Sequence, residues 1–383
     1  MNKLLLLFLL MPLSVPAADA PRARDLGIPF DGTPGPLNAI TDVAGVTVGF
    51  ETIIEDLDDG RAVRTGVTAI LPRGRDTNDR PVFGGWFSLN GNGEMTGTTW
   101  IEESGFVEGP IMITNTHSVG AVHEGTIRWR YERGAADSTG YWWSLPVVAE
   151  TWDGYLNDIN GFHVRPEHAF AAIEAAKGGP VAEGNVGGGT AMNCFEYKCG
   201  TGTASRVTEA AGVARTVGVL VQANFGRRDN LLVAGVPVGR HLRDEMVFSS
   251  RLPDIAGLGS IIIVVGTDAP LFPHQLKRLV RRAALGLART GSIASNGSGD
   301  IFVAFSTANP DATQVTADVG HRMLGNEDIN PLFLATVQAT EEAIINALVA
   351  GRTMTGNRGN RVTGIDHDEL RRVLREYGRL DED

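Results

Sequence analysis

The chain has 383 residues, of which 34 are Lys or Arg and 45 are Asp or Glu, so its formal net charge at pH 7 is −11. Nucleic acids are held by clusters of basic side chains that neutralise phosphates, and this acidic composition argues against nucleic acid as a partner. With 43% hydrophobic and 21% charged residues, the chain has enough apolar material for a substantial core, which excludes a mainly disordered protein.

The first twenty residues have the pattern of a secretory signal peptide. Lys3 precedes the apolar run 4–11, and an Ala-Asp-Ala sequence that ends at Ala20 is of the A-x-A cleavage type. The apolar run is about half of the roughly 20 residues that a membrane span requires. The pattern therefore predicts removal of residues 1–20, a periplasmic or secreted protein, and no membrane attachment after the signal is removed.

Short β-branched runs between glycine-rich turns predict strands, and apolar residues recurring at helical spacing predict helices. In chain order the predicted elements are strands at 46–48, 67–71 and 111–113, a helix at 166–177, strands at 217–221 and 260–265, a helix at 273–289, a strand at 301–305, and helices at 330–350 and 366–377. Segments 260–265 and 301–305 are apolar on successive residues, as in strands that are covered on both faces. We therefore predict a layered α/β protein in which two packed sheets lie between helical layers, built as a single domain over 21–383.

The chain has two cysteines, Cys194 and Cys199. Outside the cytoplasm a disulfide between them is allowed, and a four-residue spacer is short but feasible in a turn. Two reduced thiols are the alternative, and the sequence does not decide between them. No metal site is predicted, because no C-x-x-C pair, H-E-x-x-H helix or compact histidine cluster accompanies the cysteines.

Familiar catalytic strings such as G-x-S-x-G, S-x-x-K, Walker A and G-x-G-x-x-G are absent. One junction is chemically suggestive, because a glycine-rich turn delivers Ser260 directly to the start of a buried strand. If the peptide bond before it is strained, the Ser260 hydroxyl can attack the Gly259 carbonyl to form an ester that water resolves. The α-amine so released, with a reference pKa of roughly 7.7–8.0, can act as base for the hydroxyl of the same residue. Gly259 suits this reaction because it has no Cβ, although a Gly-Ser turn before a strand is also a common structural feature.

Longer segments in the same order along the chain are similar to one family. They are NGNGEMTGTTWIEESG from Asn90, GPIMITNTHSVG from Gly109, PVVAETWDGYLNDING from Pro146, GNVGGGTAMNC from Gly184, VQANFGRR from Val221, GLGSIIIVVGTDAPLFPHQLKRLVRRA from Gly257, and SNGSGDIFVAFST from Ser295. Together they extend over most of 21–383. The chain resembles the peptidases of the DmpA and β-peptidyl aminopeptidase type, which are self-processing N-terminal-nucleophile hydrolases.

The resemblance implies a four-layer αββα sandwich of the DmpA and ornithine acetyltransferase-like type. It implies that Ser260 is the nucleophile and that the chain cuts itself between Gly259 and Ser260, which leaves chains 21–259 and 260–383. It also implies that these heterodimers associate into a homo-oligomer, that the substrates are small peptides, amides or esters, and that no cofactor is needed.

The resemblance assigns Ser298 and Asp300 as polar partners that orient the amine and hydroxyl of Ser260. Their i, i+2 spacing at a strand entrance independently predicts that both side chains lie on one face. The family commonly has Glu where Asp300 stands, so the shorter side chain is expected to need a bridging water or a shifted strand. Asn224 matches the residue whose side-chain amide helps form the oxyanion hole. The structural alternative for Ser298 and Asp300 is a turn before a strand. The structural alternative for Asn224 is a cap at a strand end.

An aminopeptidase must hold the ammonium of its substrate, which calls for a carboxylate in a restricted pocket. Glu150 is our candidate, with Trp143 and Trp152 as apolar or cation–π walls. Glu94 competes for the same role, and both aromatic residues are also compatible with ordinary core positions.

We therefore predict an exported aminopeptidase that works through an acyl-enzyme on Ser260. Two alternatives stay open from the sequence alone. One is an acyltransferase of the ornithine acetyltransferase kind, which normally processes before threonine. The other is a noncatalytic exported binding protein in which Gly259 and Ser260 form only a turn. Preference among L-α, D and β-amino acids depends on the shape of the pocket and is not predicted.

Overall fold

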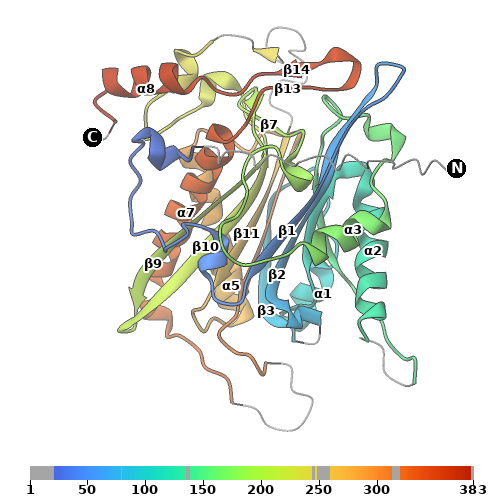
Figure 1. Ribbon diagram of the computed structural model, residues 1–383. Coiled ribbons are helices and arrows are strands. Elements are labelled where there is room, and N and C mark those ends of the chain that lie inside the picture. The colour runs from blue at the N-terminus through green and yellow to red at the C-terminus, as the bar shows by residue number, and fades with distance from the viewer. Residues whose placement is uncertain are drawn as a thin grey trace, which may run out of the picture.

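The computed structural model describes residues 21–78, 80–134, 139–243, 246–247, 259–312 and 320–380. The predicted signal peptide, 1–20, lies outside these residues, as do the first two positions of the GLGS junction. Two sheets lie face to face between two layers of helices, with α7 and α5 outside one sheet and α2 and α3 outside the other (Figure 1). This arrangement confirms the predicted αββα sandwich.

The first sheet has four strands and the second has six. In spatial order, the four-stranded sheet consists of β1 (Thr47–Asp56), β2 (Ala62–Arg75), β5 (Ile111–Asn115) and β6 (Val147–Thr151). The six-stranded sheet consists of β4 (Phe106–Val107), β3 (Val82–Gly91), β12 (Ser298–Ser306), β11 (Gly259–Thr267), β10 (Val213–Asn224) and β9 (Thr201–Ala210). Two small hairpins complete the strands, β7 (Asn193–Cys194) with β8 (Tyr197–Lys198), and β13 (Met354–Thr355) with β14 (Arg361–Val362).

The described helices are α1 (Thr98–Ser104), α2 (Val119–Glu132), α3 (Pro166–Glu174), α5 (Pro273–Val280), α6 (Ala283–Arg289), α7 (Asn330–Val349) and α8 (His367–Glu376). Of these, α2 and α3 cover the four-stranded sheet, and α5 and α7 cover the six-stranded sheet. Within the described part of the chain, one stretch, Asn326–Val349, is apolar and long enough to cross a membrane by length and composition alone. Most of that stretch is buried inside the protein, as expected of a core helix.

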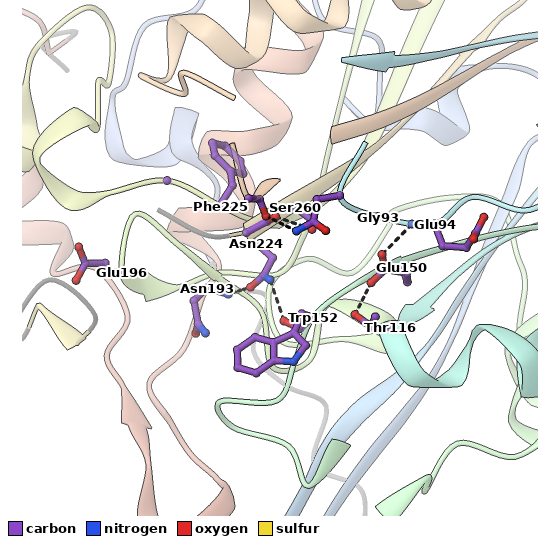
Figure 2. A pocket seen from close by; sticks show the side chains of 14 residues that line it. Gly93, Glu94, Thr116, Glu150, Trp152, Asn193, Glu196, Asn224, Phe225 and Ser260 are labelled. Atoms are coloured by element: carbon purple, nitrogen blue, oxygen red, sulfur yellow. Dashed lines mark hydrogen bonds between the residues drawn. The ribbon is translucent and has the colours of Figure 1, made fainter. Parts of the chain in front are cut away.

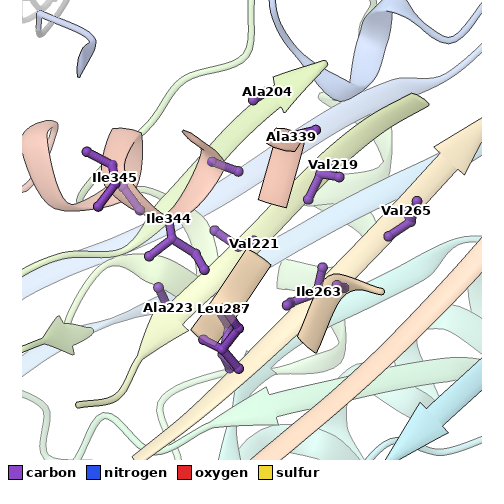
Figure 3. Close-up of a cluster of buried hydrophobic side chains, with 14 of the residues drawn as sticks. Ala204, Val219, Val221, Ala223, Ile263, Val265, Leu287, Ala339, Ile344 and Ile345 are labelled. Atoms are coloured by element: carbon purple, nitrogen blue, oxygen red, sulfur yellow. The ribbon is translucent and has the colours of Figure 1, made fainter. Parts of the chain in front are cut away.

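Strand β11 shows how the core is divided. Its alternate residues Ile262 and Val264 point into the apolar layer between the two sheets. Ile261, Ile263 and Val265 point to the other side, where they join the cluster under α6 and α7 (Figure 3). Both faces of β11 are therefore buried, which confirms the interpretation of its continuous apolar run.

The predicted helix over 273–289 is wrong in one respect, because the structure divides it into α5 and α6. At the junction the Arg282 N–H bonds to the Leu279 carbonyl at 2.9 Å, a tighter i→i−3 contact than an α-helix makes. The guanidinium of Arg282, at this junction, lies 3.9 Å from the centre of the Phe333 ring on α7, so this basic side chain packs against a neighbouring helix.

Candidate active site

The ends of three neighbouring strands bring the predicted catalytic residues together. Strand β10 is antiparallel to β11 and ends at Asn224, which pairs directly with Ser260 at the start of β11. Strand β12 runs parallel to β11, so its first residue, Ser298, pairs with Gly259. Neighbouring strands lie about 4.8 Å apart, so Asn224, Ser260 and Ser298 meet at one edge of the six-stranded sheet.

Gly259 occupies a position that has no room for a side chain. A Cβ atom built there would lie 2.3 Å from the backbone oxygen of Asn224 and 2.7 Å from Cα of Phe225. The hydroxyl of Ser260 donates a hydrogen bond to the Gly259 carbonyl oxygen at 2.6 Å. The nucleophile candidate is thus already directed at the carbonyl group of the peptide bond that precedes it.

Ser298 and Asp300 lie on one face of β12, as their spacing predicts. The Ser298 hydroxyl donates to Oδ1 of Asp300 at 2.6 Å, and the Asp300 side chain is buried. Burial raises the pKa of Asp300 to about 6, against the opposing effect of hydrogen bonds from Ser298 and from the Ile261 backbone. Its second oxygen, Oδ2, has no hydrogen-bond partner among the described residues.

The shorter side chain at position 300 coincides with an irregular strand. Between Asp300 and Ile301 the pairing with β3 shifts, because Asp300 pairs with Asn90 whereas Ile301 pairs with Ser88. Bulges of this kind bend a strand and re-aim its side chains. The structure therefore has an irregular β12–β3 pairing directly beside Asp300.

The side-chain amide of Asn224 is fixed by two hydrogen bonds. Its Nδ2 donates to the backbone oxygen of Trp152 at 2.8 Å, and its Oδ1 accepts from the backbone N–H of Asn193 at 2.9 Å. An amide NH2 carries two N–H groups. The bond to Trp152 uses one of them, so the second is available for an oxyanion.

Ser260 and Asn224 border a cavity of about 490 Å³, whereas Ser298 and Asp300 are not part of its lining (Figure 2). Its lining includes Ser260 and Asn224, the 92–94 loop, and Glu150 with Trp152 from the end of β6. The cavity therefore lies where the strand ends of the two sheets meet. Among the described residues, no cluster of three or more His, Cys, Asp or Glu side chains could hold a metal ion.

Glu150 is a buried carboxylate in the cavity wall, with 3% of its surface exposed. It accepts hydrogen bonds from the Thr116 hydroxyl and, at 3.0 Å, from the backbone N–H of Glu94. Burial raises its pKa, while those two bonds act in the opposite direction. The Glu94 side chain also lines the cavity but is exposed. Both candidates for binding an ammonium are thus at the site, and Glu150 is the desolvated one.

Of the two tryptophans expected at the site, the structure brings only Trp152 there. Trp143 is 59% exposed and packs edge-on against Tyr141, with ring centres 5.7 Å apart. Glu150 and Trp152 lie at the end of β6, whereas Trp143 precedes the start of the same strand. The intervening strand carries the two tryptophans to opposite ends of the sheet, so the prediction for Trp143 is wrong.

A hairpin that sequence reasoning did not place supplies a further wall. Cys194 and Cys199 form a disulfide with a Cα–Cα distance of 5.4 Å, which settles the alternatives left open above. The closed segment contains Glu196 and follows Asn193, and both residues line the cavity. The cysteine spacing was the signal that this segment forms a tight turn.

The chain was compared with known proteins. A model of peptidase family S58 matches residues 38–362. Over 378 residues the chain is 54% identical to the β-peptidyl aminopeptidase BapA of Sphingosinicella microcystinivorans, which covers 95% of this chain and 94% of that protein.

Solved structures agree with the sequence comparison. The L-aminopeptidase D-Ala-esterase/amidase of Ochrobactrum anthropi, a prototype for the serine aminopeptidases and a variant of the Ntn hydrolase fold, superposes with a TM-score of 0.88 at 51% identity, covering 94% of this chain and 99% of that one. A β-aminopeptidase of a Burkholderia species gives a TM-score of 0.84 at 48% identity, covering 93% and 99%.

The Ntn hydrolase fold, the match to peptidase family S58 and the serine in the cavity wall define a serine aminopeptidase. The predicted serine aminopeptidase is therefore confirmed, and the two alternatives, an acyltransferase and a noncatalytic binding protein, are set aside. More particularly, the chain belongs to peptidase family S58, the family of the DmpA and β-peptidyl aminopeptidase enzymes that the sequence resembles.

Proposed function

We propose that this serine aminopeptidase is made as an exported precursor that cuts itself between Gly259 and Ser260. The processed enzyme then releases N-terminal residues from short peptides, amides or esters through an acyl-enzyme on Ser260. The observation that carries the proposal is the 2.6 Å hydrogen bond from the Ser260 hydroxyl to the Gly259 carbonyl oxygen, directly opposite Asn224 in the β10–β11 pair.

The cut would proceed by an N→O acyl shift. The Ser260 Oγ forms a bond to the carbonyl carbon of Gly259, and the bond from that carbon to the Ser260 nitrogen breaks as the nitrogen takes up the hydroxyl proton. Water then hydrolyses the ester, which leaves a carboxylate on Gly259 and a free α-amine on Ser260. The absence of a Cβ at Gly259 is required here, because that space is filled by Asn224 and Phe225.

In the processed enzyme the new α-amine would act as the general base for its own hydroxyl. Ser298, which pairs with the residue preceding Ser260, has its proton directed to Asp300, so its oxygen lone pairs can accept an N–H of the amine. The unpartnered Oδ2 of buried Asp300 offers a negative charge that would favour the protonated amine during each cycle. Asn224 would supply an N–H to the oxyanion of the tetrahedral intermediate.

The substrate's free ammonium would bind at Glu150. A buried carboxylate needs a cationic partner to offset its desolvation, and the raised pKa of Glu150 reflects the cost of that burial. The relatives are named for β-peptides and for L-amino acid and D-alanine derivatives, which supports substrates with a free amino group close to the scissile carbonyl.

Electrophoresis and N-terminal sequencing test the proposed cut. At the mean residue mass of this 40.8 kDa chain, fragments 21–259 and 260–383 should migrate at about 26 and about 13 kDa. The smaller fragment should begin Ser-Ile-Ile-Ile, and Ser260→Ala should remain one chain without activity. Activity in a preparation that contains only uncut chain would refute the mechanism.

Export and assembly are separate parts of the proposal. The signal-like segment supports cleavage after Ala20, so the larger fragment should begin at Pro21 and should be recovered outside the cytoplasm. We also propose that processed heterodimers associate into a homo-oligomer, for which light scattering should give a mass that is a multiple of the heterodimer. A larger fragment that retains the first twenty residues, or a single heterodimer in solution, would contradict the respective part.

A further inference from the structure

The disulfide closes a hairpin whose turn the sequence itself does not favour. The turn between β7 and β8 consists of Phe195 and Glu196, whose φ values are 52° and 64°. Two-residue hairpin turns with both residues in this left-handed region strongly prefer Asn-Gly or Gly-Gly, because a side chain is strained there. Cys194 and Cys199, both fully buried, join the two sides of the turn covalently.

This hairpin is hydrogen-bonded to the side chain of Asn224 and to the backbone of the next residue, Phe225. The residue at the start of β7, Asn193, donates its backbone N–H to Oδ1 of Asn224 at 2.9 Å. Within the turn, the Phe195 N–H donates to the backbone oxygen of Phe225 at 2.8 Å. Figure 2 shows Asn193 and Asn224 side by side in the cavity wall, on the side away from Glu150.

The hairpin also packs closely against residues 225–228, which follow Asn224. The rings of Phe195 and Phe225 meet edge to face with centres 5.1 Å apart. A Cβ at Gly226 would lie 2.6 Å from the Phe195 ring, and Gly226 has a φ of +93°. Below the turn, the buried guanidinium of Arg228 donates to the Phe195 carbonyl oxygen at 2.8 Å and lies 3.3 Å from the centre of the Tyr197 ring.

We propose that the disulfide-closed hairpin 193–199 is a positioning element for catalysis, which acts by holding the side-chain amide of Asn224. This inference rests on the proposed role of Asn224 as oxyanion donor. Of the two hydrogen bonds that orient the amide, one is donated to the backbone oxygen of Trp152, just after β6, and the other is accepted from the backbone N–H of Asn193 in the hairpin. A donor stabilises an oxyanion only while it is held in place before the charge develops, so relaxation of the hairpin weakens the donor without removing it.

A double-mutant cycle separates positioning from general stabilisation. Cys194→Ser/Cys199→Ser is made in the wild-type enzyme and in Asn224→Ala, and kcat and KM are measured per molecule of processed enzyme. We expect the cysteine change to lower kcat about tenfold with KM within about twofold in the wild type, and to cause no loss beyond about twofold in Asn224→Ala. Equal factors in the two backgrounds, or an unchanged kcat in the wild type, would overturn the inference.

The kcat of Asn224→Ala shows separately whether Asn224 is the oxyanion donor at all. Asn224→Ala alone is expected to lower kcat by about 10²–10³. If it leaves kcat within about threefold of the wild type, then the oxyanion assignment itself is wrong and the inference fails with it, whatever the cysteine variant does.

A second perturbation covers the case in which the cysteine variant folds poorly. Gly226→Ala keeps the disulfide but forces the hairpin away from Asn224, so it should lower kcat in the wild type and not in Asn224→Ala. Loss of the same factor from Gly226→Ala in both backgrounds would also overturn the inference.

Discussion

The free-energy cost of burying the Asp300 carboxyl can be measured without a substrate. Its burial raises its pKa from an ordinary 3.8 to about 6 in the uncut chain, so the folded protein binds the Asp300 proton more tightly than the unfolded chain does. The sign follows directly, because stability from this group is present at low pH and is lost as the pH rises from about 4 through about 6. At 1.36 kcal/mol per pKa unit, the ionised group costs the precursor about 3 kcal/mol at pH 7.5.

The perturbation is Asp300→Asn in the Ser260→Ala precursor, which has no new α-amine to pair with the carboxylate. The amide keeps the acceptor for the Ser298 hydroxyl and removes the buried charge. We expect the free energy of unfolding to be about 2–3 kcal/mol higher than in Ser260→Ala at pH 7.5, and the difference to vanish near pH 4.

Urea unfolding of both proteins at a series of pH values measures this difference, in which groups common to the two chains cancel. Asp58→Asn, at an exposed position, is the matched control and should change the unfolding free energy by less than about 0.5 kcal/mol at every pH. A difference that does not depend on pH, or an asparagine variant that is less stable at pH 7.5, would refute the reasoning.

Three further predictions concern the reaction itself. Glu150→Gln should lower kcat/KM by about 30-fold or more, since removing one partner of a desolvated charge pair costs about 2–5 kcal/mol, and initial rates on an aminoacyl p-nitroanilide check this. Gly259→Ala should slow the conversion of precursor to fragments by at least about tenfold on time-course electrophoresis, because its Cβ would lie 2.3 Å from the Asn224 oxygen. Gly93→Ala would place a Cβ 3.2 Å from both Glu150 Oε1 and Gly299 Cα. It should change the ratio of kcat/KM for β-alanyl and L-alanyl p-nitroanilides by at least about fivefold, and an unchanged ratio would show that the 92–94 loop does not set that preference.

Strands β11 and β12 were predicted correctly because their burial is apolar. Strands β11 and β12 are covered on both faces and leave an unbroken hydrophobic run, so 260–265 and 301–305 could be located from the sequence. Strand β9 was missed because its buried positions are polar and are satisfied by distant partners. The Thr203 hydroxyl bonds to the Val219 carbonyl oxygen at 2.7 Å, and Arg206 pairs with Glu342 on α7 at 2.6 Å. Such residues are typical of loops until their partners are known.

The catalytic candidates and the binding candidates differ in how far the sequence could place them. Ser298 and Asp300 share a face because strand geometry requires it, so their contact followed from their spacing. The position of Trp143 depended on where β6 begins and ends, which the sequence did not define, and closeness to Glu150 along the chain was misleading. The cysteine pair was undecidable for a similar reason, because the 5.4 Å between the two Cα atoms depends on left-handed turn residues that are neither glycine nor asparagine.

The position of the proposed scissile bond would let a cut strand keep Ser260 in place. Gly259 and Ser260 are the first two residues of β11, and Ser260 pairs with Asn224 on β10 and with Gly299 on β12. The rest of β11 is buried on both faces, so the proposed cut would leave Ser260 anchored while its α-nitrogen becomes a chain terminus. Gly259, which lines the cavity beside Ser260, would then be free to withdraw, and the space that it leaves lies where a substrate carbonyl must sit. The precursor's own peptide bond would thus occupy the position of the substrate, and the proposed self-processing would both create the base and open the site.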